Sequence, residues 1–278
     1  MPFKFQNKHL LISLVFCNII AWSAVFYYSQ VVDVEVCFLD VGQGDSILIQ
    51  TGFNQQILID GGPDDSVIDK LEQYLPFWDR TIDLIVLTHP DKDHLFGLTE
   101  VLKSYRVKNI LWTGVEAKTL LYQEWLELIE SEKANIYIAQ KGMRIGDLEV
   151  IYPFESLEGR EISDLNDSSI VLKLNNDILF TGDVTTKIEP LLEDVDVDIL
   201  KLGHHGSKSS TSFEFLQNTS PDIAIVSAGL NNSYGHPADE VLARLDEFAI
   251  NVLQTSKLKD ICLIQNKSEH FYLLNQTE

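Results

Sequence analysis

The feature that most constrains the fold is a cluster of potential metal ligands directly after an apolar run. Residues 82–87 read Ile-Asp-Leu-Ile-Val-Leu, which is typical of a buried strand, and residues 88–94 continue Thr-His-Pro-Asp-Lys-Asp-His. Four of these side chains can donate a lone pair to a cation: His89, Asp91, Asp93 and His94. A solvated acidic turn is the alternative, but carboxylates packed this closely repel each other unless a positive charge binds among them. The pattern therefore predicts a metal site on the loop at the carboxyl end of the strand.

Two glycine-containing turns near the start of the domain also place carboxylates at strand ends. Residues 34–40 and 46–50 are predicted strands, and the turn between them is Val41-Gly42-Gln43-Gly44-Asp45. A further strand, residues 56–59, ends in Asp60-Gly61-Gly62. Taken alone, both turns are typical of ordinary hairpins.

Segments with helical periodicity alternate with strand-like runs along the rest of the chain. Helices are predicted over residues 64–75, 98–105, 120–133, 184–192 and 238–248. Alternation by itself is compatible with one parallel sheet or with two packed sheets. An acidic stretch without periodicity, residues 154–164, divides the elements into two sets and is predicted to be a loop. Four large aromatic residues are predicted to pack in the interior: Phe77, Trp78, Trp112 and Trp125.

The second half of the chain adds further polar groups at strand ends. One apolar strand ends in Thr-Gly-Asp183, and Asp183 could bind a cation or cap the helix predicted to follow it. The next strand leads to His204 and His205, whose side chains would point to opposite faces of an extended segment. One of the two is therefore expected to bind and the other to hydrogen-bond. His236, just before another predicted helix, could face a phosphate, serve as an extra ligand, or lie on the surface.

Together these motifs resemble the metallo-β-lactamase superfamily. Residues 89–94, His-x-Asp-x-Asp-His, are similar to its His-x-His-x-Asp-His signature, with Asp91 where most members carry a second His. Residues 38–45 and the Ile-Asp-Gly-Gly of residues 59–62 resemble the start of the hydrolase domain in ComEC-type DNA-internalisation competence proteins. The resemblance extends over residues 34–270 and implies an α/β fold, a four-layer αββα sandwich, in place of the single parallel sheet that composition suggests.

The resemblance also implies a dinuclear centre with two divalent ions, Zn²⁺ or Mn²⁺. The implied ligands are His89 and Asp91 for one ion, Asp93, His94 and His205 for the other, and Asp183 as a bridge. Where the superfamily usually supplies another His, residues 166–169 offer only Asn166, Asp167 or a hydroxyl. One ion would therefore have fewer ligands, and the carboxylate of Asp91 would widen the preference from zinc toward manganese.

Further residues are expected to act around this centre. The predicted catalytic residues are Asp93, His204 and His236, with the two histidines as donors to the oxyanion or the leaving group. The residues predicted to contact the ligands or the substrate are Asp40, Gln43, Asp45, Asp60, Asn166, Ser207 and Lys208. Lys201 and Lys208, with the lysines of residues 255–259, form the only local concentration of positive charge that suits an anionic substrate.

An uncharged run near the amino terminus predicts a membrane anchor. Residues 10–28 contain no Asp, Glu, Lys, Arg or His, and three basic or titratable residues precede them: Lys4, Lys8 and His9. At ~1.5 Å per residue this run just spans a hydrocarbon layer of ~30 Å. The positive flank predicts a cytoplasmic segment 1–9, a single-pass anchor 10–30 and an extracytoplasmic hydrolase domain 33–278. A cleaved signal peptide ending near Ala24 and a buried helix are the alternatives.

Cysteine positions and net charge add two expectations. Cys17 lies in the apolar run, whereas Cys37 and Cys262 lie in strand-like runs and are predicted to be small core residues, with a bridge between them left open. The formal net charge is −21. A surface this acidic repels polyanions at long range, so composition gives no support for nucleic-acid binding.

These features predict a membrane-anchored dinuclear metallohydrolase. A phosphodiester, with DNA as the first choice, is the substrate that the resemblance implies. Small esters, lactones, amides or wall-polymer phosphodiesters are alternatives within the same reaction class. A catalytically inactive binding module held by the anchor is the non-enzymatic alternative; the absence of a His in residues 166–169 favours it, and the retained ligand set opposes it.

Overall fold

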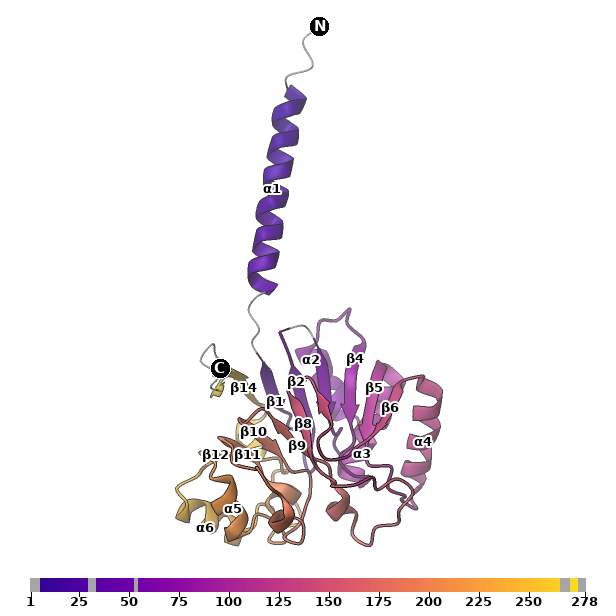
Figure 1. Ribbon diagram of the computed structural model, residues 1–278, viewed down its shortest axis with the longest axis vertical. Coiled ribbons are helices and arrows are strands. Elements are labelled where there is room, and N and C mark those ends of the chain that lie inside the picture. Colours follow the sequence, from indigo (N-terminus) through magenta and orange to yellow (C-terminus); the bar gives the residue numbers. More distant parts are fainter. Residues whose placement is uncertain (1–5, 30–33, 53–54, 266–270, 275–278) are drawn as a thin grey trace.

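The computed structural model describes residues 6–29, 34–52, 55–265 and 271–274, and the main body of these residues contains two β-sheets (Figure 1). One sheet has the strand order β15-β14-β1-β2-β3-β4-β5-β6. Its strands are β1 (Glu35–Phe38), β2 (Ile47–Gln50), β3 (Gln56–Ile59), β4 (Thr81–Val86), β5 (Arg106–Trp112), β6 (Asn135–Ile138), β14 (Ile261–Gln265) and β15 (Phe271–Leu273). The other sheet has the order β13-β12-β11-β10-β9-β8-β7. Its strands are β7 (Arg144–Ile145), β8 (Leu148–Tyr152), β9 (Val171–Leu174), β10 (Ile178–Phe180), β11 (Ile199–Lys201), β12 (Ile223–Val226) and β13 (Asn251–Gln254).

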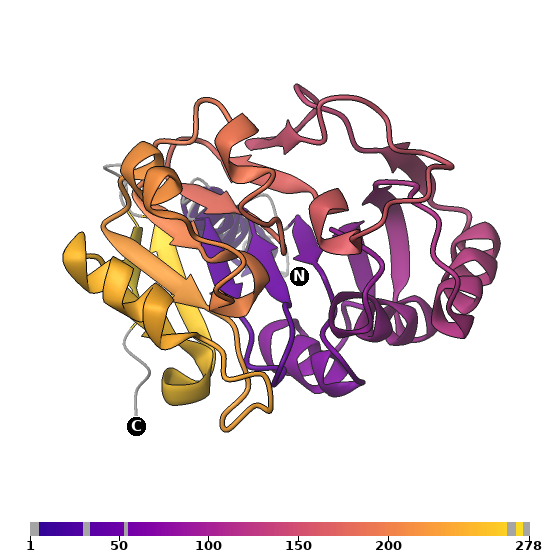
Figure 2. The same cartoon turned by 90° about the horizontal axis from the view of Figure 1, so that it is seen from below.

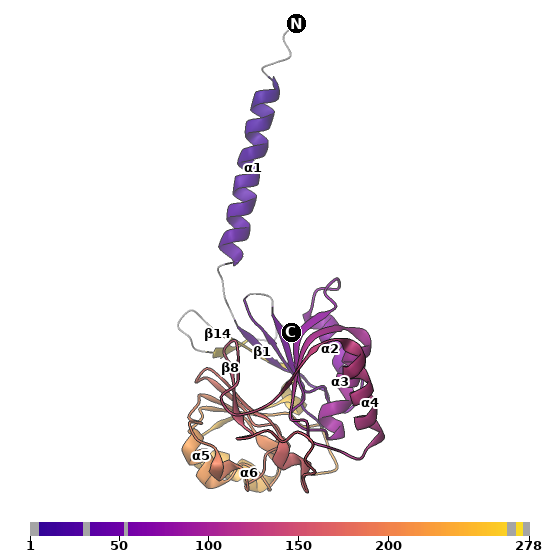
Figure 3. The ribbon, with the colours of Figure 1, turned by 45° about the vertical axis from the view of Figure 1, so that its right-hand side comes forward.

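Helices cover the outer faces of the two sheets (Figure 3). The first sheet is covered by α2 (Ser66–Tyr74), α3 (Lys92–Ser104) and α4 (Leu120–Glu132), and the second by α5 (Phe213–Thr219) and α6 (Asp239–Glu247). Helix α1 (Gln6–Ser29) precedes the sheets, and α7 (Thr255–Leu258) connects β13 to β14. Apolar side chains fill the space between the sheets, where Phe38 and Phe180 lie with ring centroids 6.1 Å apart.

Strand β4 shows why these residues form a layered core. Leu84 and Val86 face the second sheet, whereas Ile82 and Ile85 pack under the helices. A strand that is buried on both faces carries a nearly continuous apolar run, and each such side chain contributes ~1.5–3 kcal/mol when it is buried. The two sheets with helices outside them confirm the predicted αββα arrangement over a single sheet.

Residues 154–164 were predicted to separate two sets of elements, but this loop does not separate the strands of one sheet from those of the other. Strands β7 and β8 precede this acidic loop, yet they belong to the second sheet. Strand β14 comes after the whole second sheet and pairs antiparallel with β1, so the yellow carboxyl-terminal segment lies beside the indigo first strand (Figure 2). Sequence alternation locates strands but carries no information on which strands pair.

One predicted helix does not form. Residues 184–192 contain turns and the short 3-10 helix η2 (Glu189–Leu191), so the prediction of an α-helix there is wrong. The backbone N–H of Thr186 donates to the carbonyl of Ser209 at 2.8 Å. This segment therefore bonds to a neighbouring loop instead of completing helical turns of its own.

The four aromatic residues predicted in the interior divide into two pairs. Trp112 and Trp125 are buried, as predicted. Phe77 and Trp78 are 81% and 73% exposed, so their prediction is wrong. They lie in the short connection between α2 and β4 and contact each other edge to face, with ring centroids 4.8 Å apart.

The amino-terminal prediction is not supported. No helix in the described part of the chain combines the length and the apolarity needed to cross a membrane. This finding gives no support to the single-pass anchor over residues 10–30 or to the orientation that followed from it, and both stay predictions. Residues 1–5 and 30 of the predicted segments lie outside the described residues.

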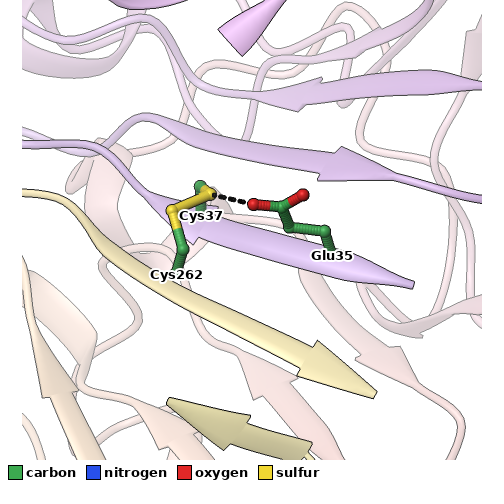
Figure 4. A group of neighbouring side chains, drawn as sticks. All are labelled: Glu35, Cys37 and Cys262. Atoms are coloured by element: carbon green, nitrogen blue, oxygen red, sulfur yellow. Dashed lines mark hydrogen bonds between the residues drawn. A yellow bond between two sulfur atoms is a disulfide. The ribbon is translucent and has the colours of Figure 1, made fainter. Parts of the chain in front are cut away.

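A disulfide joins the first strand of the domain to a strand near its end (Figure 4). Cys37 of β1 and Cys262 of β14 are register partners, are both buried, and are 225 residues apart in sequence. The carboxyl Oε1 of Glu35 lies 3.4 Å from Cys37 Sγ, and burial raises the pKa of this carboxyl. The bridge that the sequence left open is therefore present, and both cysteines are core residues.

Removal of this bridge should destabilise the chain. Replacing Cys37 and Cys262 together by alanine is expected to lower the free energy of unfolding by up to about 5 kcal/mol, because the bridge closes a very long loop. Urea titration of the oxidised full chain measures the change. Cys17→Ala is the control, since Cys17 is an exposed free thiol and its removal should have no effect. Equal stability of the wild type and the double variant would contradict the prediction.

Candidate metal centre

Three histidine rings meet where β4 and β11 end. His89 follows β4, His94 lies in the first turn of α3, and His205 follows β11; each is at most 1% exposed. The ring centroids of His89 and His94 are 4.2 Å apart, and those of His94 and His205 are 5.4 Å apart. Helix α3 begins at Lys92 rather than at residue 98, so the prediction that the whole cluster lies on a loop is wrong.

Asp60 orients His94. One carboxylate oxygen of Asp60 lies 2.8 Å from His94 Nδ1 and accepts the Thr88 hydroxyl at 2.7 Å, while the other accepts the Thr88 backbone N–H at 2.8 Å. Glycine is required for this approach, because a Cβ on Gly97 of α3 would lie 1.9 Å from the carbonyl oxygen of Gly61. With Nδ1 held in this way, Nε2 of His94 faces the centre.

His205 is held by a tight turn. Its Nδ1 lies 2.9 Å from the carbonyl oxygen of Ser227, and its Nε2 lies 3.2 Å from Asp93 Oδ2. His204 and His205 have φ values of +47° and +55°, in the left-handed region that is costly for residues other than glycine. The expectation of an extended segment is therefore wrong. The turn buries His205 and leaves His204 half-buried beside it.

His89 is held by hydroxyl groups. Thr88 Oγ1 and Ser169 Oγ lie 3.0 Å and 3.2 Å from His89 Nδ1. The Ser169 hydroxyl also accepts the backbone N–H of Asp183 at 3.0 Å. In the segment where the superfamily usually supplies another His, this chain thus brings a serine to the centre. Asp167 instead accepts hydrogen bonds from Thr185 and Lys187.

Carboxylates face the Nε2 atoms of the three rings. Asp183 Oδ2 lies 3.4 Å from His94 Nε2 and 3.5 Å from His205 Nε2. Asp91 Oδ2 lies 3.6 Å from His89 Nε2, and its side chain is 41% exposed. Asp91 occupies the N-cap position of α3 without a capping hydrogen bond from its side chain, which leaves the carboxylate available to a cation. The structure thus places all six predicted ligands together.

The charges of this cluster depend on each other. Burial acts to lower the pKa of His205, but the carboxylates of Asp183 and Asp45 outweigh it and raise that pKa to about 10. Burial acts to raise the pKa of Asp183, but the positive charges of His205 and His94 outweigh it and hold that pKa well below its usual range. Protonated imidazoles therefore balance the carboxylates when no cation does so.

The unpaired atoms at the centre fit a divalent ion. The buried atoms without a hydrogen-bond partner in the described part of the chain include Nε2 of His89, Nε2 of His94, Oδ1 of Asp183 and Oδ1 of Asp45. Two sets of ligand atoms each lie within 4.8 Å of one another: His89, His94 and Asp183, and Asp93, His94 and His205. Imidazole nitrogens and carboxylate oxygens are the ligands that zinc and manganese take.

His204 and His236 lie beside the cluster. Their ring centroids are 5.6 Å apart, and the His236 centroid is 6.5 Å from that of His205. Burial lowers the pKa of His236, and the charges of His204 and His205 lower it further. The Nδ1 of His204 lies 3.2 Å from the Ser209 hydroxyl. Both rings are therefore close enough to serve a group bound at the centre.

Three other predicted contact residues have different partners. Asp40 Oδ2 lies 3.3 Å from Lys259 Nζ, and Gln43 Oε1 accepts the backbone N–H of Gly229 at 3.2 Å. Asn166 contributes its backbone carbonyl to the N–H of Ser169. None of these contacts is made to a candidate ligand.

The predicted concentration of positive charge is incomplete. Lys201 is fully buried and lies 2.6 Å from Asp45, so it cannot meet a substrate at the surface, and that prediction is wrong. Lys208, the other lysine of this set, is exposed.

Ser207, also a predicted contact residue, has a neighbouring hydroxyl as its partner: its Oγ lies 3.0 Å from Ser209 Oγ.

Two groups that hold the histidines were not fully predicted. The sequence offered a hydroxyl of residues 166–169 without choosing Ser169, and nothing in it pointed to the Ser227 carbonyl. Ser169 stands just before the apolar strand β9, and Ser227 just after the apolar strand β12. Their positions at strand ends were the available signal. Only knowledge of which strand ends meet would have turned that signal into a prediction.

Known proteins resemble this chain in sequence and in fold. Residues 39–229 match the model of the Metallo-beta-lactamase superfamily. ComE operon protein 3 of Bacillus subtilis (strain 168) is 31% identical over 249 residues, which are 80% of this chain and 32% of that protein. Competence protein ComA of Neisseria gonorrhoeae is 31% identical over 236 residues, 80% of this chain and 31% of that protein. The crystal structure of the metallo-beta-lactamase fold protein YhfI from Bacillus subtilis has a TM-score of 0.55 at 12% identity, covering 84% of this chain and 99% of that chain.

The chain belongs to the metallo-β-lactamase superfamily. Its similarity to competence proteins, which the motifs indicated, is confirmed at 31% identity. It spans about a third of the length of these curated relatives. The fold implies divalent metal binding, and superfamily membership suggests a metal-dependent hydrolase.

The metal-free chain should lose stability as pH rises. The pKa of His205 in the folded chain is about 10, above its ordinary value of about 6.5. The stability that this group contributes is therefore fully present below about pH 6.5 and is lost as pH rises to about 10, an effect of several kcal/mol. Urea titrations in the presence of a chelator across this range measure it. His205→Asn should reduce the decline without abolishing it, because burial acts to lower the pKa of His94 but the carboxylates of Asp183 and Asp60 outweigh it and raise that pKa as well. A wild-type stability that stays constant from pH 7 to 10 would contradict the assignment.

Proposed function

We propose that this chain is a dinuclear metal-dependent phosphodiesterase. The observation that carries the proposal is that the Nε2 atoms of three imidazoles face carboxylates in one place, with unpaired buried atoms at the centre. Nε2 of His94 and His205 faces Asp183, Nε2 of His205 also faces Asp93, and Nε2 of His89 faces Asp91. The two sets of three ligand atoms share His94. This arrangement supports two adjacent cation positions, with Asp183 close to both.

The residues around the centre have distinct tasks in this proposal. One ion would be held by His89 and Asp91. The other ion would be held by Asp93, His94 and His205. Asp183 would contact both ions. Bound divalent ions lower the pKa of water and stabilise the negative charge that develops on a phosphoryl group during hydrolysis. His236, whose lowered pKa favours the neutral ring, would accept or donate a proton at the leaving group, with His204 beside it.

DNA is the proposed polymeric substrate, since the relatives include a competence protein. The exposed Lys208 follows the turn that carries His204 and His205 and would contact a phosphodiester backbone bound there. Small phosphodiesters are the second candidate, because the net charge of −21 opposes the approach of a long polyanion and Lys201 is buried. A binding module without catalysis is the third, which the serine at position 169 favours.

Metal content and hydrolysis test the reaction class. The full chain should bind about two Zn²⁺ or Mn²⁺ ions and hydrolyse bis-(4-nitrophenyl) phosphate. Asp93→Ala should lower kcat/KM by about 100-fold or more, because it removes a carboxylate that faces His205. Metal analysis after dialysis and release of nitrophenolate are the two measurements.

The control for this experiment is Asp246→Ala, since Asp246 is exposed on α6. It should leave both metal content and turnover unchanged. Metal binding without turnover would direct the search to esters and lactones. A wild-type chain without metal and without turnover would refute the enzyme and favour the binding module.

Lys208 distinguishes DNA from small phosphodiesters. If DNA binds across the turn that carries His204 and His205, Lys208→Gln should lower kcat/KM several-fold on a single-stranded oligonucleotide and reduce the slope of log affinity against log salt by about 1. Hydrolysis of bis-(4-nitrophenyl) phosphate should change little. Lys103→Gln on α3 is the matched control, because Lys103 is exposed and paired with Glu100 and Glu124. Equal losses on both substrates would argue against a polymer.

A further inference from the structure

A buried ion pair crosses between the two sheets behind the metal centre. Lys201 is the last residue of β11 in the second sheet, and Asp45 lies in the turn between β1 and β2 of the first sheet. Lys201 Nζ donates to Asp45 Oδ2 at 2.6 Å and to the carbonyl of Leu202 at 2.9 Å. Lys201 is 0% exposed and Asp45 is 2% exposed. Both partners are thus fully desolvated, and the pair is not a surface contact.

The other oxygen of Asp45 points to a candidate ligand. Asp45 Oδ1 lies 3.2 Å from His205 Nδ1, and the opposite nitrogen of that ring lies 3.2 Å from Asp93 and 3.5 Å from Asp183. The backbone N–H of Asp45 also donates to the carbonyl of Asp93 at 3.3 Å. The ammonium group of Lys201 thus contacts the Asp45 carboxylate, which contacts the His205 imidazole, and the far side of that imidazole faces the proposed cation position.

A lysine is an unexpected neighbour for a cation site. Its charge opposes metal binding, and its burial is costly unless a partner compensates for it. The ligand atoms of Asp45, Asp183 and His205 lie within 4.8 Å of one another, so Asp45 is close enough to compete for the ion. Lys201 draws one oxygen of that carboxylate away from the centre.

We propose that Lys201 and Asp45 are positioning residues of the metal centre. The Ser227 carbonyl accepts the N–H of His205 Nδ1, and Lys201 holds the Asp45 carboxylate beside the same nitrogen. Together they keep His205 Nε2 directed at the ion, and the bond to Lys201 keeps Asp45 out of the ligand set. The inference rests on the proposed function only in requiring that the centre binds a divalent cation.

The test uses Co²⁺ and Zn²⁺ on the full chain, because the visible absorption of Co²⁺ weakens when its ligands increase beyond four. In Lys201→Met the released Asp45 carboxylate should join the ion and weaken that absorption. In Asp45→Asn the Zn²⁺ affinity, measured by competition with a chelator, should fall by about 10- to 100-fold, because His205 loses its anionic partner. The double variant Lys201→Met/Asp45→Asn leaves no unpaired buried charge. It should bind Zn²⁺ as weakly as Asp45→Asn does, and its Co²⁺ spectrum should match that of the wild type.

Lys173→Met is the matched control. Lys173 is 3% exposed and pairs with Asp194, away from the centre. It should leave both measurements unchanged even if it destabilises the chain. The inference is overturned if the Co²⁺ spectrum of Lys201→Met superimposes on that of the wild type, or if Asp45→Asn binds Zn²⁺ within twofold of the wild type. A wild-type chain that binds neither ion overturns the proposed function together with this inference, whereas metal binding without hydrolysis leaves the inference standing.

Discussion

The candidate metal centre depends on a balance of charge between buried carboxylates and buried imidazoles. Asp45, Asp60 and Asp183 are nearly inaccessible to water, as are the three histidines that face them. Burying so many ionisable groups is costly unless each is paired, and the pairing here is only partly made by the protein itself. Each histidine has one nitrogen held by the fold and the other directed at a shared space. A divalent ion supplies the charge that this arrangement lacks.

The fold brings these groups together at the edge where strands of both sheets end. Strands β4 and β11 deliver the histidine motifs, and the contact between Gly61 and Gly97 lets α3 approach closely enough for Asp60 to reach His94. On the second sheet, two consecutive left-handed residues turn His205 inward. The Lys201–Asp45 pair links the two sheets behind this edge. Local backbone strain and buried charge are thus concentrated where the chemistry is proposed, and the apolar layers on either side stabilise them.

Charge at the surface and charge in the interior act in opposite directions. The chain is strongly acidic overall, which disfavours approach of a polyanion, whereas the proposed centre is built to bind cations and, through them, a phosphodiester. Lys201, which was predicted to contact an anionic substrate, is instead buried in the interior. The relatives are about three times as long as the aligned part, so in those proteins other segments accompany the region that this chain matches.

Short-range sequence patterns were enough to predict the elements and motifs that depend on neighbouring residues. The apolar run before His89 predicted a buried strand, and close-set carboxylates and imidazoles predicted a cation site, because both follow from short-range patterning and charge repulsion. The tertiary structure decided which strand ends meet. It placed Ser169 and the Ser227 carbonyl against histidines, made Lys201 an internal partner of Asp45, and bonded Thr186 to a neighbouring loop where a helix was expected. Sequence could not fix these contacts, because each joins residues far apart along the chain, and their proximity depends on strand pairing and sheet packing rather than on local propensity.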